Sequence, residues 1–318
     1  MRILKFGGKS LETTQKTQKI CKYIKKIYEN DKKLIIVVSA MGNSTNNLLD
    51  LAKQFKPEKH SKRELDTLLS TGETLSASLF AIILCSIGVP AKSFQSWQIK
   101  IKTHGDFQNS LISSIEKQNI EDCLNSNIVA IVAGFQGINS TGDITTLGRG
   151  GSDTTACALG AVFGINTELY SDFNGMFSAD PREISTKKLS SISLDQLDRA
   201  SSNGIKLVSN RAVKIAKDNN LSIILKSSSK PTQKGTIANT LEKENILLSA
   251  KTNLCEITID FPNENKLKIL SKNVIIWLKS YKIYNLDLKT KEIKLLINQG
   301  DKDEILKILS KKLNIFKC

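Results

Sequence analysis

The sequence predicts an α/β fold around a mainly parallel sheet, followed by a small α+β domain. First, short apolar segments alternate with helical segments over residues 1–240. Second, Leu34–Val38 is a continuous apolar run rich in β-branched residues, which is typical of a strand buried on both faces of a parallel sheet. Third, residues 247–318 follow a different order of elements. We therefore predict one domain in each of these two ranges.

The chain opens with a short strand that brings a lysine next to paired glycines, in the run Arg2–Gly8. A helix from Ser10 to about Tyr28 is predicted to follow. A lysine beside a helix N-terminus can reach phosphoryl oxygens while glycine amides hold them. The spacing is not that of the Walker motif. From the local sequence alone, a solvated lysine at the end of a strand is the favoured interpretation.

Two further segments contain candidate ligand-binding residues. The buried strand Leu34–Val38 is followed by Ser39 and, in the next segment, by Thr45. Ligands bind beyond the carboxyl ends of such strands. Later, Ser70 and Glu73 precede a predicted helix of small and apolar residues over 74–84. Their spacing is that of a capping box, which the local sequence favours over a ligand-binding role.

The most informative segment lies between a predicted strand, Ile128–Ala133, and a predicted helix, Thr154–Phe163. It combines a cation, paired glycines, a hydroxyl and a carboxylate: Arg149, Gly150, Gly151, Ser152 and Asp153. Glycines let the backbone approach a ligand closely, and the first amides of a helix attract anions. The planar guanidinium of Arg149 suits a carboxylate or a phosphate. The alternative is an ordinary glycine-rich turn with Ser152 or Asp153 as the helix cap.

Together these segments are similar to the signature segments of the aspartate kinases, which belong to the amino-acid kinase superfamily. The resemblance covers about three quarters of the chain and implies the three-layer amino-acid kinase fold. The chain departs from the family at Lys9, where threonine is usual. Lys9 therefore either assists nucleotide binding or turns to solvent.

The resemblance implies that ATP is the phosphoryl donor. The residues on the family's ATP-binding positions are Lys5, Phe6, Gly7, Gly8, Ser39, Ser152, Ser171, Asp172, Phe177, Arg182 and Lys206. In the family, the segment equivalent to Glu168–Arg182 wraps the adenine and ribose, although Asn174 and Phe177 replace the usual aspartate and tyrosine. Lys206 lies in a more loosely matching segment, Gly204–Val208, whose lysine reaches the phosphates in the family.

The resemblance also implies that L-aspartate is the acceptor. The residues on substrate-binding positions are Thr45, Glu73, Arg149, Gly150, Gly151 and Ser152, with Glu73 on the ammonium and Arg149 on the α-carboxylate. Lys5, Asp153 and Lys206 form the implied catalytic group. The product would be 4-phospho-L-aspartate, the entry to lysine, diaminopimelate, threonine and methionine synthesis. We expect Mg²⁺ to be held mainly by phosphate oxygens and name no protein ligand.

Two alternatives remain open at this point. One is another member of the superfamily, such as a glutamate, acetylglutamate or uridylate kinase. The other is a non-catalytic sensor that uses its C-terminal domain as a binding module.

The C-terminal residues predict a βαββαβ order that is similar to a single, shortened ACT module. The predicted elements are a strand at Cys255–Phe261, a helix at Lys266–Tyr281, strands at Ile283–Lys289 and Glu292–Asn298, a helix at Lys302–Lys312 and a brief final segment. Aspartate kinases commonly carry two such modules, with a glycine-bearing effector loop. Here Pro262–Lys266 replaces that loop without a glycine, so close backbone approach to an effector is not assured.

The composition fits a cytoplasmic enzyme. A net charge of +15 raises the question of nucleic acid or acidic membranes. Only six of the 46 basic residues are arginine and the lysines are scattered, so we predict neither partner. The six cysteines form no C-x-x-C pair, which argues against a metal cluster, and we find no sequence signal for export. We expect a homodimer or a higher homo-oligomer.

Overall fold

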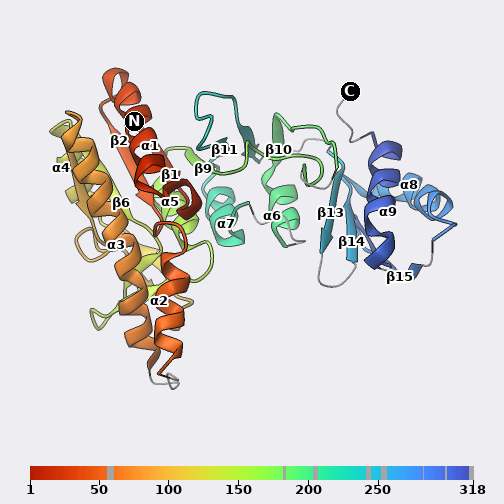
Figure 1. Cartoon of the computed structure of the whole chain (residues 1–318), viewed down its shortest axis with the longest axis horizontal. Coiled ribbons are helices and arrows are strands. Elements are labelled where there is room, and N and C mark those ends of the chain that lie inside the picture. The colour runs from red at the N-terminus through yellow and green to blue at the C-terminus, as the bar shows by residue number, and fades with distance from the viewer. Residues whose placement is uncertain are drawn as a thin grey trace. The chain divides into compact units, whose positions relative to one another are not determined.

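The computed structural model describes residues 1–55, 61–181, 184–202, 207–240, 245–251, 256–281, 283–297 and 299–314. The chain splits into two compact units (Figure 1). The first consists of Met1–Asn174 and Arg211–Gln233, and the second of Gly175–Asn210 and Lys234–Cys318. These units follow packing and not the order of the chain, so the predicted domain boundary near residue 240 stays a prediction.

Six parallel strands form the central sheet of the first unit, in the order β11-β9-β1-β2-β6-β3. Their bounds are β1 Arg2–Phe6, β2 Leu34–Val38, β3 Ala91–Phe94, β6 Val129–Ala133, β9 Thr167–Ser171 and β11 Ile223–Ser227. Every residue of β2 and β6 is buried, as expected for the central strands of a parallel sheet. The predicted mainly parallel α/β fold is confirmed.

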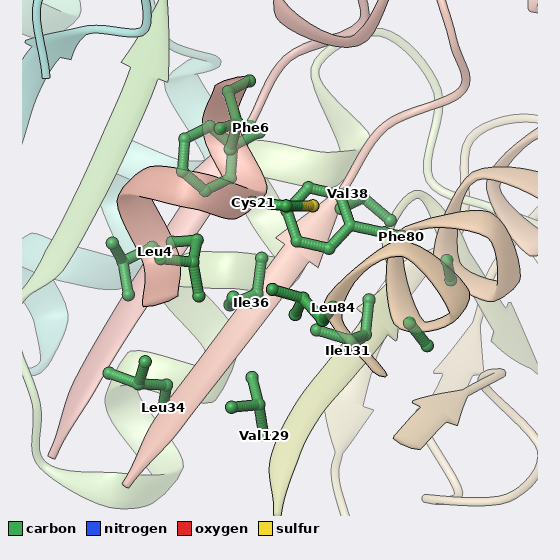
Figure 2. Close-up of a cluster of buried hydrophobic side chains, with 14 of the residues drawn as sticks. Leu4, Phe6, Cys21, Leu34, Ile36, Val38, Phe80, Leu84, Val129 and Ile131 are labelled. Atoms are coloured by element: carbon green, nitrogen blue, oxygen red, sulfur yellow. The ribbon is translucent and has the colours of Figure 1, made fainter. Parts of the chain in front are cut away.

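Helices cover both faces of this sheet. The helical elements are η1 Gly8–Leu11, α1 Thr14–Asn30, α2 Ser44–Lys53, α3 Lys62–Ser86, α4 Gln118–Asn125, α5 Gly151–Phe163 and α7 Asn210–Asp218. Leu4 and Phe6 point into a core that α1 and α3 close, together with Cys21, Phe80 and Leu84 (Figure 2). Side chains alternate along a strand, so Lys5 faces the opposite side, where α5 packs. The unit therefore has three layers.

A smaller mixed sheet in the same unit has the strand order β5-β4-β7-β8. Its strands are β4 Lys102–His104, β5 Leu111–Ser114, β7 Gln136–Ile138 and β8 Ile144–Thr146. We did not predict this sheet, because its strands are only three or four residues long. It matters for the site because β7 and β8 connect β6 to the turn before α5.

The second unit contains a parallel pair, β10 Ser191–Ser193 with β12 Thr236–Asn239, and helix α6 Leu194–Ser202. Its antiparallel sheet has the order β13-β14-β16-β15. The remaining elements are β13 Leu247–Lys251, β14 Glu256–Asp260, α8 Glu264–Trp277, β15 Ile283–Leu288, β16 Glu292–Ile297, η3 Gln299–Asp301 and α9 Lys302–Lys312.

The predicted order from β14 to α9 is confirmed, whereas β13 was missed. Residues 247–251 pair with β14 as an antiparallel neighbour, although they lie next to the predicted linker. Alternating residues of β14 and β16, including Ile257 and Leu295, pack against α8 and α9 through Val274 and Leu309. The predicted final segment falls partly on residues 315–318, which lie outside the described residues.

Helix α3 begins twelve residues before the predicted helix over 74–84, at Lys62. Ser70 and Glu73 therefore lie inside the helix, and the capping-box interpretation is wrong. The Ser70 hydroxyl instead donates to the Thr67 carbonyl at 2.8 Å. By length and composition α3 could cross a membrane, but half of its apolar window is buried, and Phe80 lies in the core. These contacts are those of a core helix.

Phe80 is the first testable position. Its side chain is fully buried, and its ring lies 6.1 Å from that of Phe6. Phe80→Ala should therefore lower the free energy of unfolding by about 3–5 kcal/mol, because it removes apolar contacts and leaves a cavity. Urea denaturation measures the change. Leu75→Ala on the exposed side of α3 is the matched control and should cost less than about 1 kcal/mol. Equal losses would contradict the packing described here.

Candidate active site

An ion pair between Lys5 and Asp153 lies at the carboxyl end of β1. The Lys5 Nζ atom is 2.7 Å from Asp153 Oδ1, and the two side chains are only 12% and 11% exposed. Lys5 reaches α5 because its neighbours Leu4 and Phe6 occupy the other face of the sheet. Asp153 lies in the first turn of α5, where the helix dipole favours a negative charge. The sequence-predicted lysine and aspartate are thus in contact.

The turn before α5 is shaped by glycines. Gly148 and Gly150 have left-handed backbones, with φ values of 73° and 72°. A Cβ atom on Gly151 would come within 2.7 Å of the Phe135 ring, because the start of α5 packs directly on the turn after β6. Ser152 is buried at this contact, whereas Arg149 is exposed. Within the described part of the chain, Arg149 forms no ion pair, so its guanidinium is available to a ligand.

The segments after β1 and β2 cross closely beside this turn. The Gly42 amide donates to the Gly8 carbonyl at 2.9 Å, and the Ser39 amide donates to the Phe6 carbonyl at 3.1 Å. A Cβ atom on Gly8 would lie 2.6 Å from the Ala40 carbonyl oxygen, so a side chain there requires a backbone shift. A Cβ atom on Gly7 would lie 3.4 Å from Lys5 Nζ. The paired glycines therefore let the backbone pass under the lysine ammonium.

Glu73 is a buried carboxylate next to the same crossing. Its side chain is almost fully buried, and Oε1 accepts a hydrogen bond from the Ala40 amide at 3.0 Å. Its Oε2 atom is buried and has no hydrogen-bond partner among the described residues. Burial raises the pKa of Glu73 to about 7. The half-buried Thr45 lies in the first turn of α2, which follows the same segment. One oxygen of Glu73 thus remains available to a cationic ligand.

The residues predicted to bind the nucleotide base and ribose are only partly described. The Ser171 hydroxyl accepts from the Phe173 amide, and Asp172 is exposed. The Lys9 side chain turns to solvent and lies 3.6 Å from Asp172 through its Nζ atom. Phe177 is a half-buried residue of the second unit. Arg182 and Lys206 lie outside the described residues.

Comparisons with known proteins agree on one family. The model of the amino acid kinase family matches residues 1–227. An aspartokinase from Bacillus sp. (strain MGA3) is 35% identical over 98% of this chain and 79% of its own length. The chain belongs to the aspartokinase family. An aspartokinase from Geobacillus stearothermophilus is 39% identical, over 74% of this chain and 58% of its own length. The chain therefore spans little more than half of some aspartokinases.

A solved aspartokinase has the same fold. The crystal structure of E. coli aspartokinase III in complex with aspartate and ADP superposes with a TM-score of 0.82, over 99% of this chain and all of that one. The sequence identity is 17%, so this match shows the fold alone. It agrees with the α/β architecture derived above for this member of the aspartokinase family.

Two charged residues beside the candidate site of this aspartokinase-family chain were not predicted from the sequence. Asp66 is fully buried on α3, and Arg211 lies at the start of α7. A carboxylate between the apolar positions Leu65 and Leu69 was an available signal for Asp66. No local signal identified Arg211, whose partners are more than sixty residues away in the sequence.

The raised pKa of Glu73 has a consequence for stability. Its ordinary pKa is 4.5, and in the folded protein the pKa is about 7. Between these values the folded state binds more protons than the unfolded state, so the free energy of unfolding falls as pH rises. Glu73→Gln resembles the protonated form. The free energy of unfolding of the variant, measured relative to that of the wild type, should therefore rise by on the order of 2–3 kcal/mol between about pH 5 and about pH 8.

Urea denaturation without substrate at the two pH values measures this gain. Other buried carboxylates, such as Asp66 and Asp260, titrate in both proteins and largely cancel in the difference. A stability difference that stays constant with pH would show that Glu73 is not held in an environment that disfavours its charge.

Proposed function

We propose that the chain transfers the γ-phosphoryl group of ATP to the β-carboxylate of L-aspartate, giving 4-phospho-L-aspartate. The observation that carries this proposal is the contact of Lys5 with Asp153 beside a glycine-shaped helix N-terminus. The relatives are named aspartokinases, and the E. coli enzyme was solved with aspartate and ADP. The product enters the synthesis of lysine, diaminopimelate, threonine and methionine. We place the enzyme in the cytoplasm.

Phosphoryl transfer depends mainly on positioning and on neutralising charge. In our proposal an aspartate carboxylate oxygen attacks the γ-phosphorus in line, and the bond to the ADP oxygen breaks. Lys5 places its positive charge on the transferring group, and Asp153 holds the ammonium in position at 2.7 Å. Gly8 adds an amide donor, and Gly7 lets the backbone approach the phosphates, although its own amide donates to the Tyr170 carbonyl at 3.2 Å. Lys206 balances the phosphates. A carboxylate nucleophile needs no general base.

The substrate is held at its two other charged groups. Arg149 binds the α-carboxylate through its exposed guanidinium, and the amides of Gly150 and Ser152 assist at the start of α5. Gly151 assists by allowing close backbone approach, since its own amide donates to the Gly148 carbonyl. Glu73 binds the ammonium through Oε2, the oxygen that lacks a partner in the described part of the chain. A buried carboxylate with one unpaired oxygen is costly unless a cation completes it, which supports this role. Thr45 contributes from α2.

We assign the rest of the nucleotide site to Ser39, Ser171, Asp172, Phe177 and Arg182, with the fully buried Phe6 supporting it from the core. Among the described residues, no group of three or more His, Cys, Asp or Glu side chains could hold a metal ion. We propose that a Mg²⁺ ion is held mainly by phosphate oxygens and water, where it would neutralise charge on the phosphates. A homodimer or a higher homo-oligomer is the proposed assembly.

The proposed reaction is tested by trapping the acyl phosphate with hydroxylamine. Purified protein, ATP and Mg²⁺ are incubated with aspartate, glutamate, acetylglutamate or uridylate, and hydroxamate and ADP are both measured. We expect ADP and hydroxamate with aspartate only. Turnover of glutamate, acetylglutamate or uridylate in place of aspartate would favour another kinase of the superfamily. Nucleotide binding without ADP formation would favour a sensor.

Lys5→Ala tests the proposed phosphate contact. Turnover should fall by about 10²–10³-fold, because the lysine charge acts most strongly on the transferring group. The Michaelis constant for aspartate should change less than about threefold. Lys16→Ala is the matched control, since Lys16 forms an exposed ion pair with Glu12 in the segment that follows. Near-normal turnover of Lys5→Ala would remove Lys5 from the mechanism.

A further inference from the structure

A second polar cluster lies directly behind the turn that carries Arg149. Here the loop at 106–110 packs on the end of β8 and on Gly148. The Ser110 amide donates to the Thr146 carbonyl at 3.0 Å, and a Cβ atom on Gly148 would lie 2.9 Å from the Gln108 carbonyl oxygen. The two segments therefore touch through their backbones, with no room for a side chain at Gly148.

Asp66 joins these two segments from the side of α3. Its carboxylate is fully buried and accepts three hydrogen bonds. Oδ2 accepts from the amides of Gln108 and Thr146, at 2.9 and 2.7 Å, and Oδ1 accepts from the Thr146 hydroxyl at 2.8 Å. Gln108 has a left-handed backbone with φ of 67°, a conformation that persists only where the surroundings hold it.

Arg211 joins the same two segments from the start of α7. Nη1 of its guanidinium donates to the carbonyls of Leu147 and Ser110, at 2.8 and 3.2 Å. Nη2 donates to the side-chain oxygen of Asn109 at 2.5 Å and approaches its carbonyl at 3.5 Å. The planar fork of arginine suits such a set of acceptors, whereas a lysine ammonium would not span them in the same way.

These contacts fix the backbone immediately before Arg149. Leu147 is two residues away, and the Gly148 carbonyl accepts from the Gly151 amide at 3.0 Å. Arg149 itself is exposed and, among the described residues, has no ion-pair partner that could hold its side chain. The position of its guanidinium therefore depends on the backbone that Arg211 and Asp66 anchor.

We propose that Arg211, together with Asp66, is a positioning residue for the substrate-binding turn. It holds Leu147 and Gly148 so that Arg149 and the N-terminus of α5 face the α-carboxylate of the substrate. Arg211 acts through this backbone and contacts no reacting atom. The inference rests on the proposed function, because it assigns the α-carboxylate of aspartate to Arg149.

If Arg211 had a purely structural role, replacing it would lower stability and would affect the Michaelis constants for aspartate and ATP alike. A positioning Arg211 affects the aspartate side selectively, because Lys5 and the paired glycines at the phosphate side are anchored by β1 and not by the loop at 106–110. The Michaelis constants for aspartate and ATP therefore separate the two roles. Added guanidinium ions provide a second way to distinguish the two roles, because they can occupy the cavity left when Arg211 is replaced by alanine.

The experiment compares wild type, Arg211→Ala, Arg211→Lys and the control Arg63→Ala. Arg63 is also a hydrogen-bonded arginine, but its partners are the neighbouring Glu64 and Asp143 at the exposed tip between β7 and β8. For Arg211→Ala we expect the Michaelis constant for aspartate to rise about tenfold, or about 1.4 kcal/mol, and that for ATP to change less than about twofold. Arg211→Lys should be intermediate, and millimolar guanidinium should lower the raised constant in Arg211→Ala only. Arg63→Ala should match the wild type.

Equal rises in both Michaelis constants, or a lower melting temperature with an unchanged constant for aspartate, would overturn the proposal. If Arg211→Ala does not fold, Asn109→Ala provides the same test. It removes one acceptor of Arg211, and a rise of about twofold to threefold is expected for aspartate alone. An unchanged constant would again overturn the proposal. Failure of the proposed function is seen separately, since the wild type itself would then not phosphorylate aspartate.

Discussion

The ion pair between Lys5 and Asp153 is the interaction on which the candidate site depends. It exists because β1 sends Leu4 and Phe6 into one core and leaves Lys5 to the other face of the sheet. It also needs α5 to begin beside β1. Gly151 allows the start of α5 to pack closely on Phe135 and Leu147. A lysine at this strand end would otherwise be solvated. The ion pair thus forms because the fold places Lys5 on β1 next to Asp153 on α5, at the carboxyl end of the sheet.

Two buried carboxylates on α3 differ in how many hydrogen-bond donors reach them. Asp66 and Glu73 are seven residues apart, which is two helical turns, so they lie on one side of the helix. Burial raises the pKa of both groups. Three donors satisfy Asp66, whereas Glu73 has one donor on Oε1 and none among the described residues on Oε2. The satisfied carboxylate anchors loops, and the unsatisfied one is suited to a ligand.

Sequence patterns predicted the elements whose burial is continuous or periodic, such as β2, β6 and α5. They failed for β13, which forms by pairing with β14. They also failed at Ser70, where capping-box spacing suggested a helix start although α3 begins earlier, at Lys62. Local pattern singled out Arg149 as a candidate anion ligand, whereas family resemblance was needed to prefer a binding role for Lys5 and Glu73. Asp66 and Arg211 were missed because their hydrogen bonds join segments remote in sequence.

The most direct test of the central claim is a double-mutant cycle on turnover at saturating ATP and aspartate. The variants are Lys5→Met, Asp153→Asn and the double substitution. If Asp153 acts by holding Lys5, the double variant should lose about as much turnover as Lys5→Met alone, so the two free-energy losses do not add. Full additivity of the two losses would contradict the account, because Asp153 and Lys5 would then contribute independently.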